Sequence, residues 1–230
     1  MPNFKPLQKC IGCACMSLPF RQLTAEQLIA VNKNRVEVTF KKGENIFKQG
    51  VLAGHLVYVK SGLVKLYREN GATDYIVGIE GKGKLLGVQA LVGKNIYPYS
   101  VQTYTDTQVC LHDLQTIKSF LTENAKFGAE LLKDLSEDSL FAYDRTACLT
   151  LKQLHGRFAD LLLCLSLRIY KRKKFTVPIT KKELAAAANM SQESLSRVIK
   201  DFVNDRIIEM KGTEISILDY EKIRHLSMVG

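Results

Sequence analysis

Residues 180–210 read TKKELAAAANMSQESLSRVIKDFVNDRIIEM, and they constrain the fold of this chain more than any other stretch. Thr180 is a good N-cap and Glu183 follows three residues later, so a helix that opens with a capping box is expected. Small residues at 185–188 let a second helix approach closely, and Asn189 tolerates the left-handed conformation of a tight turn. The stretch therefore predicts a helix-turn-helix.

The second helix of this pair is expected to begin after Ser191, another good N-cap. Helical spacing sorts its residues into two faces. The predicted buried face consists of Leu195, Val198, Ile199, Phe202 and Val203. The opposite, polar face consists of Gln192, Glu193, Ser196, Arg197 and Lys200. Such side chains match the hydrogen-bonding groups of base edges in a DNA major groove.

Two short β-rich runs follow, at 207–210 and 214–217, on either side of Lys211-Gly212-Thr213. They predict a β-hairpin where a winged helix carries its wing. A helical hairpin in an ordinary core would have no need of this hairpin, so the context favours a DNA-binding domain.

The helix-turn-helix and the wing resemble those of the Crp/Fnr family of bacterial transcription regulators, and the resemblance covers nearly the whole chain. Glu193-Ser194-Leu195-Ser196-Arg197 has the spacing of that family's recognition helix, closer to the Fnr-type variant than to the cyclic-AMP receptor variant. Arginine can donate two hydrogen bonds to O6 and N7 of guanine, and glutamate can accept one from the cytosine amine. The resemblance implies that Arg197 and Glu193 share one G·C pair. The alternative is a surface ion pair between them. The predicted base-reading residues are Gln192, Glu193, Ser196 and Arg197.

Basic residues dominate the C-terminal third of the chain. The whole chain carries a net charge of +10, and residues 153–230 hold 14 Lys/Arg against 9 Asp/Glu. The run at 171–174 is ordinarily a solvated loop, but beside a helix-turn-helix it is expected to contact phosphate. Such contacts position a protein on DNA without specifying sequence. The predicted phosphate contacts are Thr180, Lys181, Ser191, Lys200 and Lys211.

Turn signals punctuate the first half of the chain, where ten of the 15 glycines lie between Gly43 and Gly93. Many short strands at regular spacing predict a small β-barrel or a double-sheet jelly roll. The resemblance implies a β-roll similar to cyclic-nucleotide-binding domains. The strands are expected at 36–40, 55–59, 63–68, 75–79, 97–105 and 107–112.

The pattern turns helical after this region, with helices predicted at 115–124, 125–151 and 153–170. The long helix carries an apolar stripe that packs against its own roll or, as the resemblance implies, pairs two copies into a homodimer. A dimer would bind an inverted repeat. The stripe consists of Phe127, Leu131, Leu135, Ala142 and Leu149.

The predicted fold class is α+β, with an N-terminal β-roll, a long dimerisation helix and a C-terminal winged helix-turn-helix. The expected domains are the sensor at 1–122, the dimerisation helix at 123–152 and the DNA-binding domain at 153–230. A change in the sensor is expected to alter how two copies pair along the long helix and thereby to change the orientation of the two recognition helices. Such coupling is typically about 1–3 kcal/mol.

Six cysteines occur, and Cys148 and Cys164 fit buried apolar helix positions. Cys10, Cys13 and Cys15 lie within six residues, and converging thiolates select zinc, copper(I) or iron–sulfur clusters. The Fnr-type oxygen sensors resemble this arrangement, and Cys110 matches their distant ligand. The gap between the second and third cysteines is tighter here than in that family. An iron–sulfur cluster or zinc, a plain thiol switch, and no special role all stay open. The candidate metal ligands are Cys10, Cys13, Cys15 and Cys110.

The sequence disfavours cyclic AMP as an effector. Nucleotide binders of the family carry an acidic residue in the phrase that is Gly87-Val88-Gln89 here, and an Arg-Ser pair where Tyr99-Ser100 stands. Neither charge is present, so a buried phosphate would lack its usual clamp. A haem held by His55 and His112 is a weaker alternative, because isolated histidines are ordinarily surface residues.

Other function classes find little support. No run is long enough to span a membrane, and the N-terminus lacks a signal-peptide pattern, so a cytoplasmic location and no membrane partner are expected. No nucleophile elbow, HExxH or phosphate loop appears, so the chain is not expected to be an enzyme. The expected partners are double-stranded DNA, a second copy and, as the family implies, RNA polymerase. The alternative class is a ligand-binding signalling adaptor without DNA binding.

Overall fold

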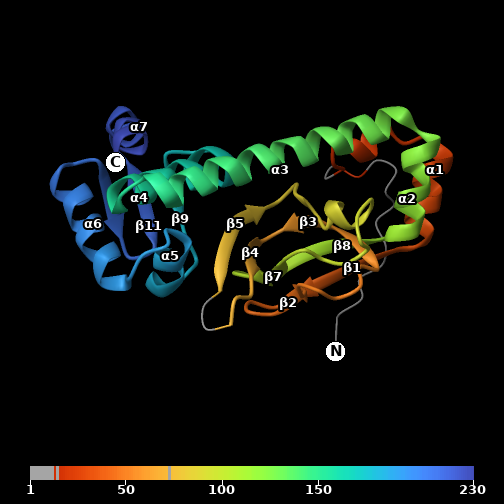
Figure 1. The fold of residues 1–230 in the computed structure, drawn as a ribbon, viewed down its shortest axis with the longest axis horizontal. Helices are drawn as coiled ribbons and strands as arrows, with labels where there is room; N and C mark the ends of the chain where they lie inside the picture. Colours follow the sequence, from red (N-terminus) through yellow and green to blue (C-terminus); the bar gives the residue numbers. More distant parts are fainter. Residues whose placement is uncertain (1–12, 14–15, 72–73) are drawn as a thin grey trace. The chain divides into compact units, whose positions relative to one another are not determined.

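The computed structural model describes residues 13, 16–71 and 74–230, so the predicted ligands Cys10 and Cys15 lie outside the described residues. The chain divides into two compact units, Met1–Leu140 and Phe141–Gly230. The division falls inside one continuous helix, α3 (Ala125–Leu151), which confirms the long helix predicted over these residues (Figure 1).

The first unit is a roll of two four-stranded antiparallel sheets, with strand orders β1-β8-β3-β6 and β2-β7-β4-β5. Alternating strand residues point inward and meet between the sheets, so the core is lined by residues such as Leu56, Val64 and Val101. The strands are β1 (Arg35–Phe40), β2 (Asn45–Phe47), β3 (His55–Ser61), β4 (Leu63–Arg68), β5 (Tyr75–Gly81), β6 (Leu85–Leu86), β7 (Ser100–Thr103) and β8 (Thr107–Asp113).

Most of the predicted strands are confirmed, with three differences. The strand predicted over 97–105 is only the four residues of β7, because Pro98 has no N–H for a sheet ladder. The short strands β2 and β6 were not predicted, since three and two residues are too few for an alternating pattern. A first helix, α1 (Ala25–Lys33), was also missed, although Thr24 and Gln27 form a capping box.

Helices cover one end of the roll, where α1 and α2 (Leu114–Glu123) contact each other (Figure 1). The short 3-10 helix η1 (Pro19–Gln22) and the start of α3 complete this layer. Phe127 and Leu131 of α3 are fully buried in the core, and the Phe127 ring lies edge-on to Phe20 and Phe120. Three residues of the predicted dimerisation stripe, Phe127, Leu131 and Leu135, therefore pack against the roll of their own chain.

The second unit is a winged helix. Its three-stranded sheet has the order β10-β11-β9, so the predicted hairpin is confirmed and a third strand joins it. The helix predicted over 153–170 is α4 followed by a π-helical turn. The elements are α4 (Leu154–Leu163), the π-helical turn η3 (Cys164–Ile169), β9 (Lys174–Thr176), α5 (Lys181–Ala187), α6 (Gln192–Asn204), β10 (Ile208–Lys211), β11 (Glu214–Ile217) and α7 (Tyr220–Val229).

Candidate nucleic-acid interface and sensor pocket

Side-chain caps fix the two helices of the helix-turn-helix in place. The Thr180 hydroxyl accepts the Glu183 N–H at 3.2 Å, and the Glu183 carboxylate accepts the Thr180 N–H at 2.7 Å. The Ser191 hydroxyl accepts the Ser194 N–H at 3.1 Å and caps α6. Asn189 has a φ of 51° in the turn between the helices. All three local predictions about this turn are confirmed.

The inner face of α6 packs against α4. Leu195, Val198 and Phe202 are buried, and the Phe202 ring meets the ring of Phe158 at a centroid distance of 5.3 Å in an edge-on arrangement. Val203 was predicted to be buried and is instead 41% exposed. It lies in the last turn of α6, at the border of the inward face.

The outer face of α6 is open to solvent. Gln192, Glu193 and Arg197 are exposed, and the Ser196 hydroxyl donates to the Gln192 carbonyl at 2.6 Å. Hydrogen bonds from its own backbone N–H and from Ser191 lower the pKa of Glu193, and the charge of Arg197 adds to this. Glu193 is therefore a carboxylate at neutral pH beside a cation, so the acceptor and the donor that a G·C pair requires lie on one face.

The predicted phosphate contacts lie around this face at exposed positions. Lys181 and Lys200 stand at the start of α5 and along α6. Lys211 ends the first strand of the wing and forms an ion pair with Glu209 at 2.9 Å. The hydroxyls of Thr180 and Ser191 already cap the helices, so any phosphate contact by these residues adds to a structural role.

The basic run at 171–174 serves partly to build the wing. Lys174 begins β9 and pairs with Glu214 of β11 at 2.9 Å. The Lys173 ammonium lies over the Tyr220 ring at 5.4 Å from its centroid. Lys171 has a φ of 52° and is exposed, together with Arg172.

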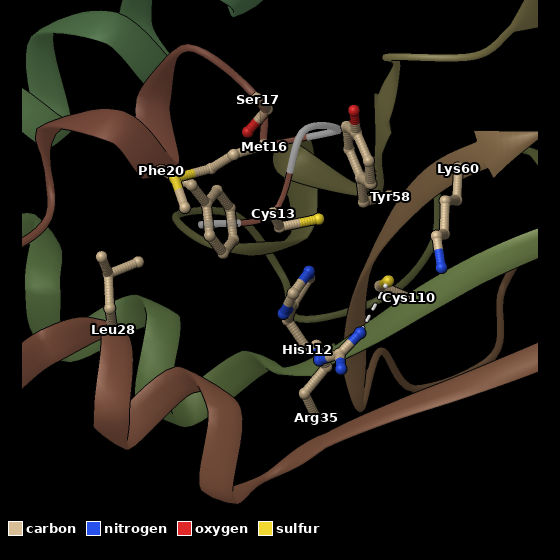
Figure 2. Close-up of a pocket in the computed structure, with 10 residues that line it drawn as sticks. All are labelled: Cys13, Met16, Ser17, Phe20, Leu28, Arg35, Tyr58, Lys60, Cys110 and His112. Carbon is tan, nitrogen blue, oxygen red and sulfur yellow. Dashed lines mark hydrogen bonds between the residues drawn. The ribbon is translucent and has the colours of Figure 1, made fainter. Parts of the chain in front are cut away.

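A small cavity of about 30 Å³ lies between the roll and the segment that precedes η1. Figure 2 shows the thiols of Cys13 and Cys110 and the imidazole of His112 directed into it. Of the four predicted metal ligands, the structure therefore brings together the two that it describes. The pocket is lined by Cys13, Met16, Ser17, Phe20, Leu28, Arg35, Tyr58, Lys60, Cys110 and His112.

Cations surround the Cys110 sulfur. Nη1 of Arg35 donates to the Cys110 Sγ at 3.1 Å, which is the dashed contact in Figure 2. Arg35 also pairs with Glu37 at 3.3 Å, and Lys60 pairs with Glu37 at 2.8 Å. Burial raises the pKa of the Cys110 thiol, and Arg35 opposes this increase. Burial alone would raise the pKa of Glu37, but Lys60 and Arg35 outweigh it and the pKa is lowered.

His112 is the second unusual group in the pocket. It is only 5% exposed, and its ring lies 4.6 Å from the Phe20 ring centroid. Burial and then the charge of Arg35 lower its pKa to about 3, so the ring is neutral at pH 7. Its Nδ1 has no hydrogen-bond partner among the described residues. The expectation of a surface histidine is wrong here, because η1 folds over β8 and covers the ring.

Tyrosines pack around Gly87, where the resemblance leads a nucleotide phosphate to be expected. Gly87, with a φ of 84°, donates its N–H to the Tyr99 hydroxyl at 3.1 Å. The Tyr97 ring stacks on Phe47 at 3.9 Å, and the Tyr97 hydroxyl donates to the His55 carbonyl at 2.7 Å. Burial raises the pKa of Tyr99, so it stays a neutral phenol. The Gly87 N–H and the hydroxyls of Tyr97 and Tyr99 therefore already have hydrogen-bond partners within the roll.

Comparison with known proteins decides the family. The model of the cyclic nucleotide-binding domain matches residues 37–124, and that of the Crp-like helix-turn-helix domain matches residues 156–226. The transcriptional activator protein FnrA of Stutzerimonas stutzeri is 25% identical over 184 residues, 78% of this chain and 75% of that protein. The chain belongs to the Crp/Fnr family. It is a DNA-binding transcription regulator with a cyclic-nucleotide-binding-like sensory domain.

Other Crp/Fnr proteins show how far the likeness extends. The CRP-like cAMP-activated global transcriptional regulator of Mycobacterium tuberculosis is 22% identical over 209 residues, 89% of this chain and 93% of that protein. The structure of FixK2 from Bradyrhizobium japonicum superposes with a TM-score of 0.79 at 18% identity, covering 85% of this chain and 98% of FixK2. These relatives are transcription regulators rather than enzymes, and the predicted α+β architecture is confirmed.

Two further findings concern this Crp/Fnr chain itself. In the part that the structure describes, no helix combines the length and the apolar character needed to cross a bilayer. Sequence reasoning missed Arg35 and Lys60 of the pocket and considered His112 only as a haem ligand. The pairing of β1 with β8 places Glu37 opposite Cys110, so a correct strand register would have pointed to these neighbours.

Proposed function

We propose that this Crp/Fnr regulator binds an inverted-repeat operator as a homodimer, and that a signal at the cysteine pocket sets its affinity for DNA. The observation that carries the proposal is the exposed polar face of α6 on a packed winged helix. Arg197 would donate to guanine O6 and N7, and Glu193 would accept from the paired cytosine. Gln192 and Ser196 would contact the neighbouring base pairs.

The open face of α3 supports a homodimer. Leu132, Leu140, Tyr143 and Leu151 are 68%, 59%, 71% and 81% exposed. Helical spacing places all four in one stripe along α3, with Lys133 at its edge. This stripe lies on the face opposite to Phe127 and Leu131, which the roll covers. A second copy would bury it in coiled-coil fashion.

A dimer with one recognition helix per copy fits two successive major grooves about one helical turn apart. Bound at a promoter in the cytoplasm, it would act on RNA polymerase, the partner that membership of the family implies. The positive charge of the chain favours this role, because phosphate contacts supply much of the affinity of such proteins for DNA.

For the sensor, we propose a thiolate-bound centre, an iron–sulfur cluster or zinc, held by Cys13 and Cys110 with Cys10 and Cys15 as the remaining ligands. Two of these thiols already face one cavity. Arg35 and Lys60 add positive charge beside the sulfur of Cys110, which suits an anionic thiolate centre. Metal binding would displace the thiol proton in spite of the raised pKa of Cys110.

Cyclic AMP is not the proposed effector. Tyr99 occupies the Gly87 N–H, and the Ser100 hydroxyl accepts the Gln49 N–H and donates to Glu69. A nucleotide phosphate would have to displace these contacts without an arginine to replace them. We expect no binding of cyclic AMP in calorimetry at millimolar nucleotide. Micromolar binding would overturn this part of the proposal.

Selection of operators from random duplexes, followed by fluorescence anisotropy, tests the DNA-binding proposal. The expected result is an inverted repeat bound by two copies, with affinity that falls steeply as salt rises. A folded protein that binds a ligand but no DNA would instead support a signalling adaptor, and equal binding to all sequences would exclude sequence recognition.

Anaerobic purification tests the sensor proposal separately. We expect the protein to contain either iron and sulfide or zinc. Substitution of Cys110 by Ser should remove whichever of these is present. The Cys148→Ser variant, in which the changed thiol is buried in the other unit, is the matched control. Protein that contains none of these elements after anaerobic preparation would exclude the metal centre.

A further inference from the structure

Two arginines hold the turn of the helix-turn-helix. Arg157 of α4 donates from Nη1 to the Asn189 carbonyl at 3.2 Å. The same guanidinium donates from Nη2 to the Leu149 carbonyl at 2.9 Å and from Nε to the Lys152 carbonyl at 2.9 Å. One side chain thus joins the C-terminal end of α3, the segment after it and the turn before α6.

The second arginine comes from α3 itself. Nη2 of Arg145 donates to the Ala187 carbonyl at 2.6 Å, and Ala187 is the last residue of α5. Both arginines are partly buried, and all of these contacts lie within the unit Phe141–Gly230. Two separate side chains therefore connect the turn between α5 and α6 to α3.

The acceptors explain why arginine suits these positions. The last four carbonyls of a helix have no partner within that helix, and the C-terminal end carries partial negative charge. Leu149 lies in the last turn of α3, Ala187 is the last residue of α5, and Asn189 follows in the turn. A guanidinium offers five N–H donors in a rigid fork, so one arginine can satisfy several such carbonyls at once. A lysine could not reproduce this geometry.

We propose that Arg145 and Arg157 form a turn clamp that sets the orientation of α6 relative to the C-terminal end of α3, and thereby fixes which half-site spacing a dimer accepts. This inference rests on the proposed binding of an inverted repeat. Two recognition helices match successive grooves only if each is held at a defined angle to the helix that pairs the two copies. Neither arginine touches DNA in this role, so both are positioning residues.

The first test compares half-site spacings. Wild-type protein, the double variant Arg145→Gln/Arg157→Gln and the single variants are titrated against the selected operator and against versions lengthened or shortened by one and two base pairs. We expect wild-type protein to prefer one spacing by on the order of tenfold or more, and the double variant to lose most of this preference. Affinity for one half-site should change by less than about threefold, because the base contacts remain.

Two further variants separate geometry from charge. Arg157→Lys keeps the charge but not the fork, so it should lose spacing preference as Arg157→Gln does. Arg224→Gln removes an exposed arginine of α7 from the same unit and should behave like wild type. A folded double variant that keeps the wild-type spacing preference would overturn the turn clamp.

Amide hydrogen exchange gives a second readout that does not depend on DNA. We expect exchange at Asn189 and Met190, whose N–H groups bond to Ala186 and Ala185, to be roughly tenfold faster in each single variant than in Arg224→Gln. Unchanged exchange would overturn the turn clamp even if the double variant failed to fold. Conversely, wild-type protein with no preference for two half-sites would refute the proposed function, while faster exchange in the variants would still support the clamp.

Discussion

The outer face of α6 and the cysteine pocket differ in almost every physical respect. On α6, Glu193 and Arg197 are exposed and come from one helical turn. In the pocket, Cys110 and His112 are buried and Arg35 reaches the Cys110 sulfur across 75 residues of sequence. The helix face presents charges to solvent, whereas the pocket encloses them with specific partners.

This difference indicates how each region works. An exposed charge pair can meet DNA without rearrangement, so substitutions there should change affinity and leave stability alone. Buried groups with shifted pKa values respond to protonation, oxidation or metal, so substitutions there should change stability and response and leave base preference alone. Substitutions at Arg197, His112 and Ser191, each with a control, test this separation.

Arg197→Ala is expected to have the largest effect, and only on DNA recognition. Loss of a bidentate contact to guanine costs about 1–3 kcal/mol per half-site, or roughly 5- to 150-fold in affinity. The melting temperature should stay at the wild-type value, because the side chain is exposed. Anisotropy with operator and scrambled duplexes measures the preference, and an unchanged preference in the variant removes Arg197 from base reading.

Lys200→Ala is the matched control on the same helix. It should weaken binding to operator and scrambled DNA alike and reduce the salt slope by about one. If Arg197→Ala also altered the metal content or thiol reactivity of the protein, the separation between the two regions would be broken.

His112 should make the sensor sensitive to acid. Its pKa in the folded protein, about 3, lies below the ordinary value of 6.5, so the unfolded chain takes up the proton first. Stability is therefore complete above pH 6.5 and falls as the pH drops, by about 2 kcal/mol at pH 5. Urea unfolding at pH 7 and pH 5 measures this loss, which the His112→Gln variant should not show.

His55→Gln provides the control for that experiment, because His55 is an exposed histidine on β3. It should keep the acid-dependent loss of stability seen in wild-type protein. An equal loss in His112→Gln would mean that the buried imidazole does not govern the acid response. The base preference of both variants should match wild type at pH 7.

Substitutions at Ser191 should have the smallest effect, and they should separate a loss of stability from a loss of DNA affinity. Ser191→Ala removes the N-cap of α6 and is expected to cost about 1 kcal/mol of stability. Ser191→Asp keeps the cap, but its carboxylate would repel a DNA phosphate. Thermal melts should therefore show a loss only in Ser191→Ala, and Ser191→Asp should bind all duplexes more weakly. Wild-type affinity in Ser191→Asp would exclude a phosphate contact at this position.

Local chemistry made the helix-turn-helix predictable. The caps at Thr180 and Ser191, the turn at Asn189 and the hairpin around Gly212 each depend on residues only a few positions apart. Their partners are near in sequence, so a pattern in the sequence is sufficient. The same reasoning was wrong at Val203, because helical spacing alone does not tell how much of a residue at the border of a face is covered.

The sequence by itself therefore determined the β-roll, the long helix and the exposed polar face of α6, because periodicity and caps encode them locally. Only the tertiary structure decided which face of α3 stays open, since Phe127 and Leu131 are buried by strands and helices distant in sequence. It also decided that His112 is covered and that Arg35 meets Cys110. These contacts join residues far apart in the chain, and their existence depends on sheet register and packing that no local pattern specifies.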